Sequence, residues 1–278
     1  MEDIIWITKK VYYKIQNFII NIILTCYKLL NRSSSKNILF FDKPKWHTDL
    51  KEAFKFSSHT ITYGTLDNKC IDEHDLIIPL TLNNLKDSNV RNLIKNKTIP
   101  LPSMDSILLC DNKIDFNNFM IANGFKANIP ELEKPFNFPY ILKKNQDEYG
   151  ENTFIIYNVE DEKNYAEQLN SPDFFSQEII KGKNEYATHI NFADNKIVNS
   201  LTVKYIFKSE MVIKGKHNNL IKTITYCPYL ELFTSILQTI GFNGICCFNY
   251  KVKDNVPYIL EINPRFGGSL CSYFYLFL

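Results

Sequence analysis

Three polar side chains near the end of the chain have the spacing of ligands on one strand face. Glu261, Asn263 and Arg265 occupy alternate positions, and alternate side chains of a strand point to the same side. The positions between and before them are apolar and are predicted to enter a core: Tyr258, Leu260 and Ile262. Two oxygen ligands and a guanidinium suit a divalent cation that carries phosphate. The sequence therefore predicts a metal and phosphate site here.

A second strand places another oxygen ligand beside Glu261. The segment Gly244–Lys253 is predicted to form a hairpin with the strand that carries Glu261. A two-residue turn would pair Phe248 with Glu261, whereas a three-residue loop, Asp254–Val256, would pair Asn249 with it. We predict the second register, because it adds a third oxygen-bearing side chain to the same face.

The composition favours a globular protein in a reducing compartment. Hydrophobic residues make up 45% of the 278 residues, which is enough for a sizeable core. A formal charge of +2, without a basic stripe interleaved with aromatics, gives no reason to expect nucleic acid as a partner. The seven cysteines are odd in number and form no CxxC pair, so buried thiols are expected instead of disulfides or a zinc site. We therefore expect a cytoplasmic protein.

Residues 4–30 carry an apolar stripe at helical spacing. Its members recur every three or four positions: Ile4, Ile7, Val11, Ile15, Phe18, Ile22, Cys26 and Leu29. Lysines flank it: Lys9, Lys10, Lys14 and Lys28. The longest charge-free run, residues 15–27, is too short and too polar to span a bilayer. Three alternatives stay open: a helix lying in the inner membrane interface, a helix that binds a partner or forms a homodimer, and a helix packed on this chain.

The rest of the chain is predicted to form two domains after a first unit, residues 1–36, of helix and linker. Residues 37–104 alternate short apolar strands with helices, which is typical of a small parallel α/β domain. Its strands are expected at Asn37–Phe41, Thr60–Tyr63 and Leu76–Leu80, and its helices at Leu50–Phe56 and Asn83–Lys95. A larger domain follows at 105–278, with subdomains 105–175 and 176–278.

Four segments of this larger domain resemble motifs of the ATP-grasp superfamily, in that family's order. They are Asp111-Asn-Lys113, Pro139–Lys143, the Glu-x-apolar-x-Gly-x-x-Glu segment Glu178–Glu185, and the Glu-x-Asn-Pro-Arg segment Glu261–Arg265. The resemblance is greatest to the branch of the carbamoyl phosphate synthetase large subunit. It implies an ATP-grasp fold, α/β overall and α+β in the C-terminal half. It also implies ATP and one or two Mg²⁺ or Mn²⁺ ions as cofactors.

The resemblance assigns a role to each matched residue. The peptide from Glu178 to Ile180 would bind the purine edge, and Glu185 would accept from the ribose hydroxyls. Lys113 and Lys143 would bind the phosphates. The metal ligands would be Asn249, Glu261 and Asn263, and the catalytic cations would be Arg265 and Lys204.

Several positions depart from the family's pattern. Relatives often have arginine at the matched lysines and usually Glu or Gln where this chain has Asn249. The lid segment Lys144–Asn152 has a single glycine and three acids, which are unfavourable beside a polyphosphate unless they point away.

The resemblance favours an ATP-dependent carboxylate–amine ligase. It would form a C–N bond through an acyl-phosphate and take a small-molecule carboxylate and a small-molecule amine. The alternatives are an ATP-grasp kinase, a non-catalytic nucleotide-binding module, and a membrane-tethered scaffold.

Overall fold

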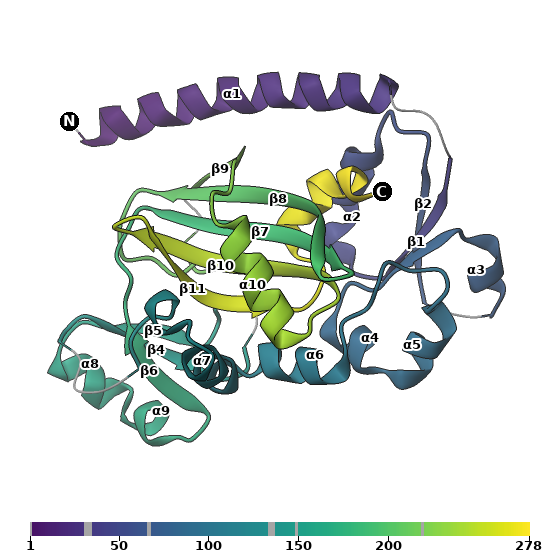
Figure 1. The fold of residues 1–278 in the computed structure, drawn as a ribbon. Helices are drawn as coiled ribbons and strands as arrows, with labels where there is room; N and C mark the ends of the chain where they lie inside the picture. Colours follow the sequence, from purple (N-terminus) through teal and green to yellow (C-terminus); the bar gives the residue numbers. More distant parts are fainter. Residues whose placement is uncertain (1, 31–34, 66–67, 133–136, 148–149, 218–219) are drawn as a thin grey trace.

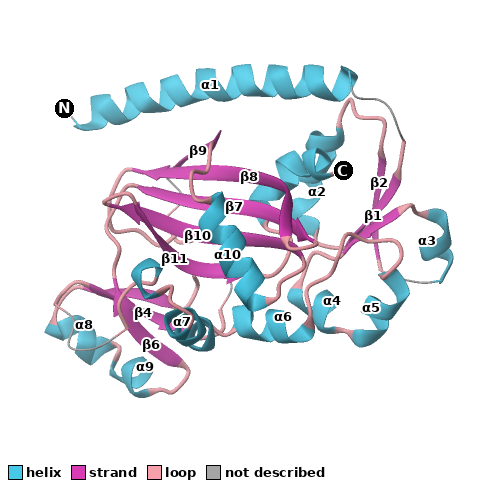
Figure 2. Ribbon diagram, viewed as in Figure 1, coloured by secondary structure: helices cyan, strands magenta, loops and turns pink. Residues whose placement is uncertain are grey.

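The computed structural model describes residues 2–30, 35–65, 68–132, 137–147, 150–217 and 220–278. Within these residues the chain forms one parallel and two antiparallel sheets, with helices packed on them (Figures 1 and 2). Most of the predicted linker at 31–36 and Glu148 of the predicted lid lie outside the described residues. The predicted domain bounds stay a prediction.

The first sheet is parallel, as predicted. It consists of β1 (Asn37–Phe41), β2 (Thr60–Gly64) and β3 (Leu76–Ile78) in the order β2-β1-β3. The helices around it are α2 (Pro44–Phe54), α3 (Asn68–Glu73), α4 (Leu82–Lys86) and α5 (Ser88–Ile94). The strands β1 and β3 are mostly buried, as is usual for strands of a parallel sheet, whereas the edge strand β2 is partly exposed.

Two helix predictions in this region were wrong in their bounds. The helix expected to begin at Leu50 begins at Pro44, because proline is favoured in a first helical turn. The single helix expected at Asn83–Lys95 is broken at Asp87. The Asp87 carboxylate accepts hydrogen bonds from the backbone N–H groups of Asn89 and Val90, so it caps a new helix.

The largest sheet is antiparallel and has the order β11-β10-β7-β8-β9. Its strands are β7 (Asn184–Ala193), β8 (Lys196–Phe207), β9 (Leu220–Thr225), β10 (Gly244–Lys253) and β11 (Val256–Asn263). Helix α10 (Leu230–Ile240) covers one face, where Phe233 stacks on Phe248 with ring centroids 4.2 Å apart. Helices α6 (Met104–Asp111) and α7 (Lys113–Ala122) and the 3₁₀ turn η1 (Lys126–Asn128) lie beside β11.

A small antiparallel sheet forms a separate lobe. Its order is β5-β4-β6, and its strands are β4 (Tyr140–Lys144), β5 (Thr153–Ile156) and β6 (Phe174–Glu178). Helices α8 (Val159–Asn164) and α9 (Ala166–Asn170) pack on it. Figure 1 shows this lobe against the edge of the large sheet that carries β11.

The last element is the 3₁₀ helix η2 (Gly268–Phe277). Its Phe274 ring lies 5.6 Å from the Phe40 ring of β1 and 6.5 Å from Phe54 of α2. Therefore η2 joins the parallel sheet to the large antiparallel sheet through one aromatic core.

The hairpin of β10 and β11 pairs Asn249 with Glu261, as predicted, but by a different route. The turn has two residues, Asp254 and Asn255, both with positive φ, as in a type I′ turn. A register shift beyond Tyr250 then restores the predicted pair.

This shift also corrects the predicted core face of β11. The residues buried in the core are Ile259 and Ile262. Leu260 lines a cavity instead, and Tyr258 is only half-buried.

The N-terminal segment is one helix, α1 (Glu2–Leu30), that lies over β8 and β9 (Figure 1). Trp6 packs on Ile206 and Ile221, and Asn17 donates to the backbone carbonyl of Lys222 at 2.7 Å. Among the described residues, no helix is long and apolar enough to cross a bilayer. The predicted apolar stripe is exposed, so the side that packs on the chain is not that stripe.

The cysteines follow the prediction in part. Five thiols are buried: Cys110, Cys227, Cys246, Cys247 and Cys271. Cys26 is exposed on α1, and the side chain of Cys70 lies outside the described residues.

Candidate active site between two sheets

A cavity of about 790 Å³, counting its open mouth, lies between the small sheet and the strands β7, β10 and β11. Four lysines and four acidic residues line it: Lys113, Lys143, Lys214, Lys251, Asp147, Glu178, Glu185 and Glu261. Ile180 and Asn249 also line it. The cavity therefore brings together residues of all four motifs, which are far apart in the sequence.

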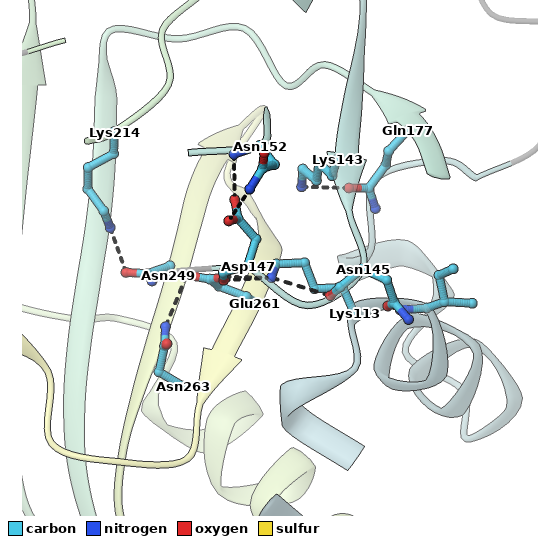
Figure 3. A network of polar contacts seen from close by, with 11 residues as sticks. Lys113, Lys143, Asn145, Asp147, Asn152, Gln177, Lys214, Asn249, Glu261 and Asn263 are labelled. Carbon is cyan, nitrogen blue, oxygen red and sulfur yellow. Dashed lines mark hydrogen bonds and ion pairs between the residues drawn. The ribbon is translucent and has the colours of Figure 1, made fainter. Parts of the chain in front are cut away.

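Glu261 is the centre of a polar network (Figure 3). Its Oε1 accepts from Asn249 Nδ2 at 2.7 Å and from Asn263 Nδ2 at 3.0 Å. Its Oε2 lies 3.7 Å from Lys113 Nζ. Burial opposes ionisation, but Lys113, Lys214 and the two amides outweigh it and lower the pKa of Glu261 to about 2. The carboxylate is therefore ionised at neutral pH.

Lys214 joins this network to the predicted ribose acceptor. Its ammonium lies 2.8 Å from Glu185 Oε1 and 2.7 Å from Asn249 Oδ1. Burial opposes the charge, yet the nearby Glu185 carboxylate raises the Lys214 pKa above its usual value.

Lys214 was missed at the sequence level, because it lies in the loop between β8 and β9, outside every motif. Gly150 lets that loop pass close by, because it has no side chain. A Cβ at Gly150 would lie 3.0 Å from Ile213 Cγ2, and the Gly150 φ of +67° also favours glycine.

Lys113 contacts the first residues of the predicted lid. It is the first residue of α7, and its ammonium donates to the Asp147 carbonyl at 3.2 Å. Asn145 Oδ1 accepts from the Ile114 backbone N–H at 2.9 Å, which ties the lid to the start of the helix. The Asp147 carboxylate accepts from the backbone and side-chain N–H groups of Asn152. This acid is therefore satisfied within its own loop.

Lys143, near the end of β4, is buried against the small sheet. Its ammonium donates to Gln177 Oε1 at 2.8 Å, and Gln177 Nε2 donates to the Pro130 carbonyl at 3.1 Å. Burial lowers the pKa of Lys143 to about 8, although Glu261 partly offsets this effect. The pKa of this amine is therefore closer to neutral pH than that of an ordinary lysine.

A second lysine outside the motifs fixes the nucleoside segment. Lys251 Nζ donates to the carbonyls of Ile180, Gly182 and Glu210 at 3.1 to 3.3 Å. It therefore anchors the chain between β6 and β7. Glu178, at the end of β6, lies 3.6 Å from Lys253 Nζ.

The two predicted catalytic cations lie outside the cavity lining. Lys204 of β8 is paired with Tyr186 of β7, and its ammonium lies over the Tyr186 ring. This pair lies on the opposite face of the sheet from the neighbouring pair, Glu185 and Tyr205. Arg265 is buried, and its Nη1 donates to the Phe266 carbonyl at 3.0 Å. Asn263 contacts Glu261 but does not line the cavity.

His189 is fully buried. Its Nε2 lies 2.7 Å from Ser269 Oγ, and burial lowers its pKa to about 3. A Cβ at Gly267 would lie 2.6 Å from His189 Cε1, so glycine is required there.

The cavity offers oxygen donors for one divalent cation. In the described part of the chain, no three His, Cys, Asp or Glu residues form a metal-binding group. Glu261 supplies an ionised carboxylate, and Asn249 and Asn263 supply amide groups beside it. Glu261 fits Mg²⁺, which takes one or two carboxylates and completes its shell with phosphate and water, whereas the two amides present their nitrogens, not their oxygens, to Glu261.

Residues 110–269 match the family of ATP-grasp domains. The chain belongs to the ATP-grasp family. Solved structures agree with the fold of this ATP-grasp protein at low identity. D-alanine–D-alanine ligase from Bacillus anthracis is 13% identical, with a TM-score of 0.55 over 86% of this chain and 89% of that one. Phosphoribosylamine–glycine ligase from Thermotoga maritima is 14% identical, with a TM-score of 0.60 over 85% of this chain and 70% of that one.

Two further proteins are similar. L-amino acid ligase from Bacillus licheniformis is 13% identical, with a TM-score of 0.59 over 87% of this ATP-grasp chain and 70% of that chain. An uncharacterised protein of Methanocaldococcus jannaschii is 25% identical in a match of 260 aligned residues, and the match covers 77% of this chain. The match spans 63% of that relative's length.

Proposed function

We propose that this protein is an ATP-dependent ligase that joins a carboxylate to an amine. The observation that carries the proposal is the convergence of four sequence-distant motifs on one cavity, with an ionised Glu261 facing Lys113 and Lys214. The ligases that share the fold support the same reaction class.

The cavity divides into parts that suit the parts of ATP. Glu185 can accept from ribose hydroxyls, because an ionised carboxylate only accepts hydrogen bonds. Lys113, Lys143 and Lys214 supply positive charge for the phosphates, which carry negative charge at neutral pH. The apolar stretch at Ile179 and Ile180 forms a wall against which a purine can lie.

A magnesium ion held by Glu261 and the neighbouring amides would neutralise the negative charge that shifts onto the leaving group during phosphoryl transfer. The protein's own contribution is charge and position. Lys113 and Lys214 lie on either side of Glu261, so both can contact phosphate oxygens. These ammonium groups stabilise the charge that develops on the transferred phosphoryl group.

The proposed reaction has two steps. A carboxylate oxygen attacks the γ-phosphorus, the bond to the β-bridging oxygen breaks, and ADP leaves. The nitrogen of a neutral amine then attacks the acyl carbon, inorganic phosphate leaves, and the amine proton passes to solvent. Water must be excluded between these steps, which suits the lid that starts at Lys144.

A nucleotide-binding module without turnover is the second candidate. The observation that favours it is that the cavity lining includes neither Arg265 nor Lys204. In this case ATP would bind without consumption.

A trapping experiment separates these functions. The protein is incubated with ATP, Mg²⁺ and pools of carboxylates, and hydroxylamine replaces the amine. A ligase produces hydroxamate, ADP and inorganic phosphate in equal amounts. A kinase produces ADP and a stable phosphorylated product. A binding module shows ATP binding by calorimetry but no ADP with any pool, which would overturn the ligase proposal.

A further inference from the structure

Helix α1 turns its apolar stripe away from the rest of the protein. The side chains of Ile15, Phe18 and Ile22 are 57%, 66% and 49% exposed. The opposite side faces the sheet, where Trp6 is only 9% exposed and Asn17 donates to the carbonyl of Lys222. Figure 1 shows α1 as one straight rod along this side of the molecule. The helix is therefore held on the side that carries Trp6 and Asn17, and its apolar stripe is exposed.

The exposed apolar surface is wide. With successive residues about 100° apart, exposed apolar side chains from Ile7 on one margin to Ile23 on the other span an arc of about 160°. The seam between two coiled-coil helices is narrower than this, since it uses two positions in every seven. A flat apolar medium covers such an arc better than one partner helix does.

Positive charge lies along both margins of this surface. Lys9 lies on one margin of the apolar arc, and Lys10 and Lys14 lie on the other. All three lie between the arc and the side of the helix that packs on the sheet. The Asp3 carboxylate lies 2.6 Å from Lys208 Nζ, so its charge is compensated by the protein itself. Among the described side chains, no acid interrupts the apolar arc. The surface is therefore apolar in the middle and basic at its edges.

We propose that this face of α1 binds an anionic lipid bilayer, with the helix lying in the plane of the interface. The apolar arc would enter the acyl boundary, and the marginal lysines would contact anionic headgroups. The small sheet that forms one wall of the cavity lies on the opposite side of the molecule from α1 (Figure 1). Docking would therefore leave that lobe in water.

The test uses the full chain and vesicles of phosphatidylcholine, with or without roughly one third phosphatidylglycerol. The wild type is expected to co-sediment with the anionic vesicles and more weakly with the neutral ones. The double variant Phe18→Asp/Ile22→Asp should bind at least about tenfold more weakly, because it places two carboxylates in the apolar arc. The matched control is Leu108→Asp/Val159→Asp, which makes the same change at exposed apolar side chains on α6 and α8. It should bind as the wild type does.

Fluorescence reports the orientation. The two tryptophans, Trp6 and Trp46, are buried, so brominated lipid should leave wild-type emission unchanged. The variant Phe18→Trp should be quenched. Quenching of the wild type would show that α1 leaves the sheet and would overturn the docked orientation.

Two other results would overturn the proposal. Equal binding by the wild type and the Phe18→Asp/Ile22→Asp variant would show that the arc is not the contact. Absence of vesicle binding, together with a dimer in ultracentrifugation that this variant abolishes, would show that a second copy of the chain covers the face.

Discussion

ATP binding is expected to be coupled to protonation of Lys143. Burial lowers the pKa of this lysine to about 8 in the free protein. A polyphosphate beside the ammonium favours its charged form and so raises its pKa in the complex. About 0.5 proton should therefore be taken up per ATP at pH 8, about 0.1 at pH 7 and about 0.9 at pH 9. If only the charged form binds, affinity should fall about tenfold from pH 7 to pH 9.

The assay is calorimetry in buffers that differ in their enthalpy of ionisation. The slope of the observed binding enthalpy against the buffer enthalpy gives the number of protons taken up. Lys143→Met should bind ATP more weakly at pH 7 and lose most of the proton uptake. Lys163→Met, at an exposed lysine of the same lobe, is the matched control and should behave as the wild type does.

Two results would refute this reasoning. The first is a wild-type slope near zero at pH 8, which would mean that Lys143 does not change protonation on binding. The second is the same slope in Lys143→Met, which would assign the proton to another group.

The remaining predictions concern the network around Glu261. Glu261→Gln should fold normally but lower turnover by about 100-fold or more, because Lys113 and Lys214 lose their common carboxylate. Turnover is measured as ADP release, and folding by a thermal melt. Normal turnover would mean that the metal site lies elsewhere. Asn249→Asp should lower the Mg²⁺ concentration needed for half-maximal turnover, because it adds a second carboxylate beside Glu261; an unchanged magnesium titration would contradict that role. Glu185→Gln should weaken ATP binding by on the order of 1–3 kcal/mol, because it removes a carboxylate acceptor. Calorimetry with ATP and with a ribose-deoxy analogue of ATP checks this. If the substitution weakened the binding of both ligands equally, the ribose hydroxyl would not be the partner of Glu185.

Two of the predicted site residues that line the cavity lie at ends of elements, where local sequence determines the position. Lys113 begins α7 and Glu178 ends β6. Asn112 caps α7 by accepting from the Asp115 backbone N–H at 3.0 Å, so the helix start is encoded locally.

The site residues that were missed depend on contacts between distant segments. Lys214 lies in a loop that passes close to Gly150 of another lobe, a contact that the local sequence does not indicate. Lys204 lies on the other face of β8 from Tyr205, and the sequence alone does not determine this, because side chains alternate along a strand and only the pairing with Tyr186 fixes the side. The stripe of α1 was recognised from its spacing, yet spacing alone does not determine whether such a stripe faces a core or the exterior.

The hairpin of β10 and β11 shows how one residue decides the chemistry of the cavity. A type I′ turn at Asp254 and Asn255 with regular pairing beyond it would put Phe248 opposite Glu261. The extra residue of β11 near Leu260 shifts the pairing by one position. As a result, Ile259 and Ile262 both enter the core, while Glu261 lies beside Asn249 in the cavity lining. One short hairpin can therefore combine a tight turn, a buried apolar face and a charged site, because the strand pairing is irregular at this point.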